Sequence, residues 1–246
     1  MSTDQVIEQP RTSTLFSEER QATTTASSLD IPSGYQRAIR FGANWTLITS
    51  PYMILYLIVV LAIGLNDSSS IRQMLEFAGR SPVAFGATVL LDGLSHVLFF
   101  VTFVTLFAVI RLRWPVWASL IMVAGAWQMI IGFTKALSSF ITFTSLGAAY
   151  VAGDTALRAT LVPVATGADG LRQALQLMDS YGVALIWVII SLLPRESGLP
   201  RAVRWLGWIL AFALIGPDPG FLLVILLSPV WAVLVGLWLK RLLAAK

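Results

Sequence analysis

The chain has 246 residues, of which 57% are hydrophobic and 12% are charged, whereas a soluble domain carries about 25% charged residues. Too little polar surface is left to cover such an apolar interior, so the composition excludes an ordinary soluble domain and predicts a protein dissolved largely in lipid. Cysteine is absent, which excludes disulfides and thiolate chemistry. The net charge of +4 does not indicate nucleic acid, because the basic residues flank apolar segments instead of forming a patch with aromatics.

Residues 1–44 differ in composition from the rest of the chain. They are rich in Ser, Thr, Gln and Glu, and their apolar residues are scattered. Such a segment cannot bury enough apolar surface to fold alone, so it is predicted to be a flexible cytosolic tail. The alternative is a segment that a partner orders.

Residues 45–243 are predicted to form the membrane part. Crossing the hydrocarbon layer takes about 20 helical residues. The predicted spans are 45–65, 83–110, 114–133, 174–193, 200–215 and 221–239. The uncharged part of 200–215 begins only at Trp205, and its helix of about 16 Å is too short to cross by itself.

Segment 134–173 is the least membrane-like part of the interior because serine and threonine dilute its apolar residues. A helix that continued from the third span through this segment would be longer than a bilayer is thick. We therefore expect that helix either to project on the outer side or to break near Gly132. Residues 163–170, which contain Pro and Gly, are expected to form an external loop, and 171–178 to begin the fourth helix.

The basic residues predict the orientation. If all six segments cross, twelve of the 17 lie in the connections on one side, and these are Arg11, Arg20, Arg37, Arg40, Arg111, Arg113, Arg195, Arg201, Arg204, Lys240, Arg241 and Lys246. The other side has Arg72, Arg80, Lys135, Arg158 and Arg172. Cytoplasmic loops keep an excess of Lys and Arg. The predicted fold is therefore an all-α polytopic bundle of about six spans, with both termini cytoplasmic.

Few polar groups lie inside the predicted spans, and groups in this position suggest a function because burying them in a membrane is costly. Asp92 and His96 are four residues apart and so share a helix face. Gln128 lies in the third span, Lys135 at its outer end, and Asp179 near the start of the fourth. These five residues are the candidates for binding a ligand or relaying a proton. The alternative is that they only join neighbouring helices, with Lys135 paired to a carboxylate.

Neither a metal site nor a catalytic site is predicted. Zinc needs three or four ligands, and no spacing pattern brings Asp92, His96 and Asp179 together. Ser95 is next to His96, but consecutive helical residues do not face each other, so a serine nucleophile activated by that base is not expected. His96 is the only histidine and could at most be a single axial ligand to a haem or chlorin. The sequence requires no cofactor.

Four stretches carry a resemblance to a known family. They are 86–92 (GATVLLD, running on to 108–110), 124–132 (AGAWQMIIG), 200–207 and 234–240 (LVGLWLK). They resemble the domain-of-unknown-function 4386 family of bacterial six-span membrane proteins, over roughly residues 45–243. Asp92 stands where that family has an acidic residue, whereas Gln128 stands where it has an arginine. The resemblance implies a six-helix membrane bundle and supplies no established activity.

Two functions follow as hypotheses. The first is a non-catalytic integral protein of the bacterial inner membrane, which acts as an accessory or scaffolding subunit or binds a lipid-like ligand. Its partners would be the bilayer, other membrane subunits or further copies of itself. The second is a small proton-coupled carrier that uses Asp92, His96, Lys135 and Asp179. A carrier should place these groups opposite one another near mid-membrane, whereas a scaffold should bury them in helix contacts and keep a broad apolar flank.

Overall fold

The structure is a computed structural model that describes residues 31–63, 70–215 and 219–244. Helices are the only regular elements in these residues. In chain order they are α2 (Ser33–Ile63), α3 (Ile71–Arg80), α4 (Pro82–Ile110), α5 (Pro115–Ala152), α6 (Thr155–Ser191), the 3-10 helix η1 (Arg195–Ser197), α7 (Arg201–Ile215) and α8 (Pro219–Ala244). The predicted all-α class is confirmed for the described residues. Five of these helices, α2, α4, α5, α6 and α8, are long and apolar enough to cross a membrane.

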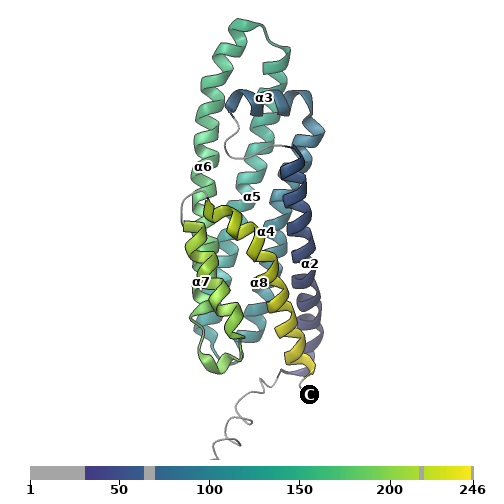
Figure 1. The fold of residues 1–246 in the computed structure, drawn as a ribbon, viewed down its shortest axis with the longest axis vertical. Helices are drawn as coiled ribbons and strands as arrows, with labels where there is room; N and C mark the ends of the chain where they lie inside the picture. Colours follow the sequence, from purple (N-terminus) through teal and green to yellow (C-terminus); the bar gives the residue numbers. More distant parts are fainter. Residues whose placement is uncertain (1–30, 64–69, 216–218, 245–246) are drawn as a thin grey trace, which may run out of the picture.

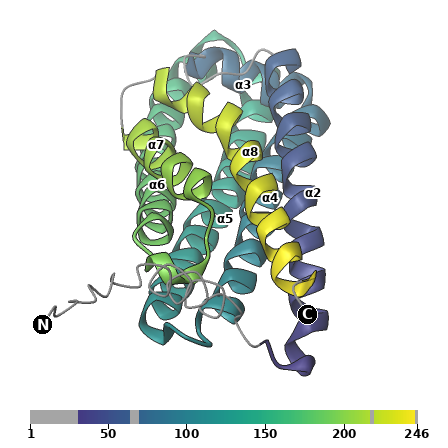
Figure 2. The same ribbon diagram turned by 60° about the horizontal axis from the view of Figure 1, so that its bottom comes forward.

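Six helices form an elongated bundle (Figure 1). Within this set each helix packs against two others, so that the order around the bundle is α2, α4, α5, α6, α7, α8 and back to α2, as Figure 2 shows. The start of α2 and the end of α8 lie at the same end of the bundle (Figure 1). Helix α7 has 15 residues and a length of about 22 Å, which is shorter than the hydrocarbon layer.

Helix α2 begins at Ser33, ahead of the predicted start of the first span at residue 45. The earlier start has a packing reason, because Ile39 and Ala43 are completely buried in the main hydrophobic core. The end of the predicted tail is therefore helical. Residues 1–30, for which the flexible tail was predicted, lie outside the described residues.

Helices α5 and α6 form a long hairpin that projects beyond the other helices (Figure 1). Helix α5 has 38 residues, about 57 Å, and it runs through Gly132 without a break. The helix therefore does not break near Gly132, and the hairpin extends beyond the other helices instead. The external loop predicted over 163–170 is wrong, because α6 is helical from Thr155 onward with Pro163 inside it. Tertiary packing outweighs the local preference of Pro and Gly there, since Ala165 is fully buried.

Helix α3 was missed in the sequence, where its residues were assigned to a connection. Its start carries a capping box, in which the Ser70 hydroxyl accepts from the backbone N–H of Gln73 and the Gln73 side chain accepts from the backbone N–H of Ser70. The helix lies across the hairpin (Figure 1). Met74, Leu75 and Ala78 face inward and join a second hydrophobic core with residues of α4, α5 and α6.

The main core fills the half of the bundle where α2 begins and α8 ends. Trp187 of α6 and Trp231 of α8 are fully buried there and meet edge to face, with ring centroids 6.4 Å apart. At the same end, Arg204 of α7 closes the connection from α6 by donating to the backbone carbonyls of Leu193 and Pro194. The polar residues singled out in the sequence lie between the two cores.

Candidate functional site

Helices α4, α5 and α6 bring all five predicted site residues together. Asp92 and His96 project from one face of α4, Gln128 and Lys135 from α5, and Asp179 from α6. A charged side chain in an apolar helix lowers its free energy by facing the bundle interior and pairing there. Spacing along the sequence does not unite Asp92, His96 and Asp179, and it is the packing of α4, α5 and α6 that brings them together. We refer to Asp92, His96, Lys135 and Asp179 as the ionic centre.

Lys135 links the two carboxylates of the ionic centre. Its Nζ lies 3.0 Å from Oδ2 of Asp92 and 4.0 Å from Oδ2 of Asp179. It also donates a hydrogen bond of 2.7 Å to Oε1 of Gln176 on α6. The ammonium group is thus bound most closely by Asp92 and Gln176. The expected pairing of Lys135 with a carboxylate is therefore present, and it involves both carboxylates.

The imidazole of His96 lies between the same two carboxylates. Its Nε2 is 3.9 Å from Oδ1 of Asp92, and its Nδ1 is 3.5 Å from Oδ1 of Asp179. The amide nitrogen of Gln128 lies 2.5 Å from Nδ1. An axial bond to a porphyrin would need a ring nitrogen that points into open space, and both nitrogens of this ring face protein side chains instead.

Glycine 132 provides the space for that ring. A Cβ added at Gly132 would lie only 2.3 Å from Cε1 and Nδ1 of His96. Helices α4 and α5 can therefore approach each other with the imidazole between them. A helix break near Gly132 was one of the two sequence predictions, but α5 is continuous there and the glycine makes room for a neighbouring side chain.

Burial differs within the ionic centre. The side chains of His96, Lys135 and Asp179 are 6% or 7% exposed, while that of Asp92 is 24% exposed. Within the ionic centre and the adjoining Gln128, three buried polar atoms lack a hydrogen-bond partner among the described residues, and these are His96 Nε2, Gln128 Oε1 and Asp179 Oδ1. Because buried polar atoms are normally paired, the centre has unused capacity to hold a proton.

Helix α2 adds groups that sequence reasoning missed. The hydroxyl of Tyr56 donates to Oδ1 of Asp92 at 3.4 Å, and the hydroxyl of Tyr52 donates to the backbone carbonyl of Leu91. The two tyrosines are four residues apart in the first predicted span, so a polar stripe on one face of that helix was a signal that could have found them. Gln176, three residues before Asp179, gave a similar signal.

No hydrolytic or metal arrangement accompanies the ionic centre. The hydroxyl of Ser95 donates to the carbonyl of Asp92 in its own helix at 2.6 Å, so it does not serve as a nucleophile for His96. Among residues 31–63, 70–215 and 219–244, no group of three or more His, Asp and Glu side chains is arranged to hold a metal ion. The contacts found within this centre are ion pairs and hydrogen bonds.

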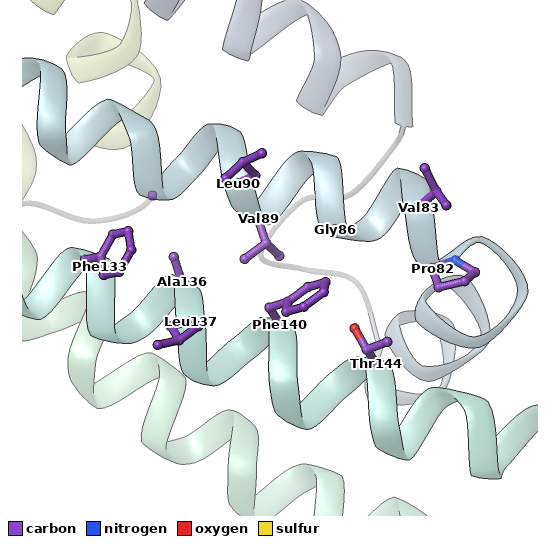
Figure 3. Close-up of a pocket in the computed structure, with 11 residues that line it drawn as sticks. Pro82, Val83, Gly86, Val89, Leu90, Phe133, Ala136, Leu137, Phe140 and Thr144 are labelled. Atoms are coloured by element: carbon purple, nitrogen blue, oxygen red, sulfur yellow. The ribbon is translucent and has the colours of Figure 1, made fainter.

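A groove of about 530 Å³ runs between α4 and α5 (Figure 3). Its lining residues are Pro82, Val83, Gly86, Val89, Leu90, Gly93, Phe133, Ala136, Leu137, Phe140 and Thr144. All but Thr144 are apolar. Leu90 and Phe133 remain largely exposed, so the groove opens sideways. We refer to it as the α4–α5 groove.

Gly93 and Ala136 separate this groove from the ionic centre. A Cβ added at Gly93 would lie 3.2 Å from the Cβ of Ala136, so the two helices touch there. These residues directly follow Asp92 and Lys135 in the sequence. The two sites are therefore adjacent and lie on opposite sides of one helix–helix contact. Comparisons with protein-family models, curated proteins and solved structures found no match to this chain.

Proposed function

We propose that the chain is a multi-pass protein of a bacterial inner membrane that crosses six times, with both ends in the cytoplasm, and catalyses no reaction. The charge distribution supports this orientation. The described basic residues near the end where α2 begins are Arg37, Arg40, Arg111, Arg113, Arg195, Arg201, Arg204, Lys240 and Arg241. Membership of the domain-of-unknown-function 4386 family, which the sequence resembles, is part of the same proposal.

The function proposed is the binding of a lipid-like molecule, as an accessory component of the membrane. The observation that supports it is the α4–α5 groove. An apolar groove at membrane depth offers water no hydrogen-bond partners, and left empty it would lose dispersion contacts along its whole lining. We therefore assign it an acyl chain. Its position beside a rigid helix–helix contact would hold one chain in a defined place.

The outer end of the groove suits a phospholipid. Arg80 ends α3 two residues before Pro82, which lines the groove, and Arg80 is exposed. Arginine binds phosphate oxygens through parallel hydrogen bonds. Thr144 lies at the same end (Figure 3), and its buried hydroxyl has no hydrogen-bond partner among the described residues. A phospholipid with one acyl chain in the groove would place its anionic headgroup at this end, where Arg80 and the Thr144 hydroxyl could both bind it.

Photolabelling tests this function. The protein would be reconstituted with a phosphatidylglycerol that carries a diazirine in its acyl chain, and the labelled residues would be mapped by mass spectrometry. Labels should concentrate on the lining of α4 and α5. Leu137→Trp, which fills the groove, should remove them, whereas Leu177→Trp, at a similarly exposed position on α6, should not. Equal labelling of all lipid-facing helices would refute the assignment.

The second candidate function is a proton-coupled carrier that uses Asp92, His96, Lys135 and Asp179. One observation favours it, which is that these four ionisable groups from three helices meet in one place. Intramembrane clusters of this kind recur in proton-driven transporters. The burial of three of the four groups in helix contacts is the feature expected of a scaffold, so this candidate stands second.

Proteoliposomes with a pH-sensitive dye inside test the carrier. A pH gradient would be imposed with and without a defined mixture of amino acids, sugars and organic acids outside. A carrier should move protons faster when its substrate is present, and the double variant Asp92→Asn with His96→Gln should abolish that difference. Identical proton movement in the presence and absence of the mixture, or in wild type and double variant, would exclude coupling through these residues.

A further inference from the structure

The ionic centre carries an uneven set of charges. Two carboxylates, Asp92 and Asp179, face one ammonium group, Lys135, and one imidazole, His96. With a neutral imidazole the centre would have a net charge of −1. Unpaired charge in a buried site is unfavourable by several kcal/mol in typical cases (about 3–5). One additional proton would make the centre neutral.

The geometry indicates where that proton belongs. Lys135 is 3.0 Å from Asp92 but 4.0 Å from Asp179, and it also donates to Gln176. Asp92 further accepts from Tyr56 of α2. The ion pair between Lys135 and Asp179 is therefore the weaker of the two, and Oδ1 of Asp179 has no hydrogen-bond partner in the described part of the chain. The atom nearest to that oxygen among the titratable groups is Nδ1 of His96, at 3.5 Å.

The two ring nitrogens of His96 face two different carboxylates. Nε2 points toward Asp92 and Nδ1 toward Asp179. An imidazole that accepts a proton on one nitrogen can release one from the other. Asp92 is the member with the larger exposed fraction, 24%, and Asp179 is buried behind the ring. This order, from Asp92 through His96 to Asp179, leads from the more exposed carboxylate of the centre to the more buried one.

We propose that the ionic centre binds one exchangeable proton, which the His96–Asp179 pair shares and which reaches it through Asp92. In the binding step, a hydronium ion gives a proton to the Asp92 carboxylate and leaves as water. Asp92 then passes the proton to Nε2 of His96, whose neutral ring already carries a proton on Nδ1. The resulting imidazolium then faces Asp179 through its Nδ1–H. The Gln128 amide beside Nδ1 turns in this state, so that its otherwise unpartnered Oε1 faces the ring instead of its nitrogen. No other bond forms or breaks, and the centre changes its charge by +1. The groups that face the ring are Asp92 from its own helix, Gln128 and Lys135 from α5 and Asp179 from α6, and Tyr52 and Tyr56 of α2 flank Asp92.

This inference depends neither on a lipid in the α4–α5 groove nor on transport. A protein that binds a lipid, or one that carries no substrate, would hold the proton for the same electrostatic reason. The experiment therefore measures the proton directly. A negative result in the proton measurement would leave the photolabelling and flux results unaffected. Negative results in those two experiments would likewise not alter the proton measurement.

The single histidine of this chain makes the test specific. Protein labelled with ¹⁵N-histidine in lipid nanodiscs gives ring signals from His96 alone, and these distinguish the imidazolium from the neutral ring. Across a pH series the wild-type ring should exchange between the two forms. The Asp179→Asn variant, which lacks the facing carboxylate, should hold the ring proton about tenfold less tightly or worse. Asp169→Asn is the matched control, a buried aspartate of the same helix that pairs with Arg172, and it should leave the titration unchanged.

Two results would overturn the proposal. One is a wild-type ring that stays in a single protonation state from mildly acidic to mildly alkaline pH. The other is a titration that is the same in Asp179→Asn as in wild type. Should Asp179→Asn fail to fold, Asp92→Asn supplies a second comparison, because it should slow the exchange of the ring proton with water. Unchanged exchange in that variant would contradict the route through Asp92.

Discussion

The imidazole of His96 lies against the backbone of Gly132, so closely that a Cβ at Gly132 would be 2.3 Å from the ring. This contact sets the distance between α4 and α5 at the level of the ionic centre. It also fixes the ring between Asp92 and Asp179. A packing feature and an electrostatic feature therefore depend on the same glycine.

The first prediction concerns that contact. Gly132→Ala should lower the free energy of unfolding by about 1–3 kcal/mol, because the methyl group overlaps the buried ring. Alanine in a helix is otherwise more stable than glycine by about 0.5–1 kcal/mol. Gly167→Ala on α6, where an added Cβ would meet nothing within 4 Å, should show that gain. Unfolding of both variants in detergent checks the prediction, and a stabilised Gly132→Ala protein would contradict it.

The second prediction concerns the buried charges. Lys135→Met leaves the Asp92 and Asp179 carboxylates without their ammonium partner and should cost about 3–5 kcal/mol in unfolding free energy. Adding Asp92→Asn to this variant should restore part of the loss, because one of the two uncompensated charges is removed. Lys240→Met, at an exposed position on α8, should change stability by less than about 0.5 kcal/mol. A double variant less stable than Lys135→Met would show that the pairing does not stabilise the fold.

The third prediction concerns the topology. The chain lacks cysteine, so single cysteines report their side of the membrane through a membrane-impermeant maleimide. Ala156→Cys at the tip of the α5–α6 hairpin should react in intact cells, and Arg113→Cys only after the membrane is opened. If α7 crosses, Arg201→Cys should behave like Arg113→Cys, and Ile215→Cys, at the other end of α7, like Ala156→Cys. Equal reactivity of the two ends of α7 would mean that this helix does not cross.

The fourth prediction concerns the docking of α3. A Cβ at Gly147 of α5 would lie 2.7 Å from the backbone nitrogen of Gly79 and 2.8 Å from the carbonyl oxygen of Leu75, so Gly147→Ala should lift α3 off the hairpin. Leu75 is 0% exposed. In a Leu75→Cys background, thiol labelling should be slow, and Gly147→Ala should accelerate it at least about tenfold. Gly170→Ala, where an added Cβ meets nothing within 4 Å, should not. Slow labelling in both variants would show that α3 tolerates the methyl group.

The sequence by itself determined the helical class of the described residues and the identity of the polar residues that meet. Both follow from solvation. Long apolar segments in lipid must satisfy their backbone hydrogen bonds internally, which favours helices. A few ionisable residues inside such segments must face the interior and find one another, so Asp92, His96, Lys135 and Asp179 could be named as candidates before their contacts were known.

Only the tertiary structure decided how these residues meet. The approach of each ring nitrogen of His96 to a different carboxylate depends on the rotation of α4 relative to α5 and α6, which spacing along one helix does not contain. The same holds for the helical course of α6 through Pro163 and for the docking of α3, because both are stabilised by contacts between segments distant in the chain. Hydrophobicity is a property of each residue separately and could be read from the sequence. Packing depends on which two surfaces meet, and this is known only from the tertiary structure.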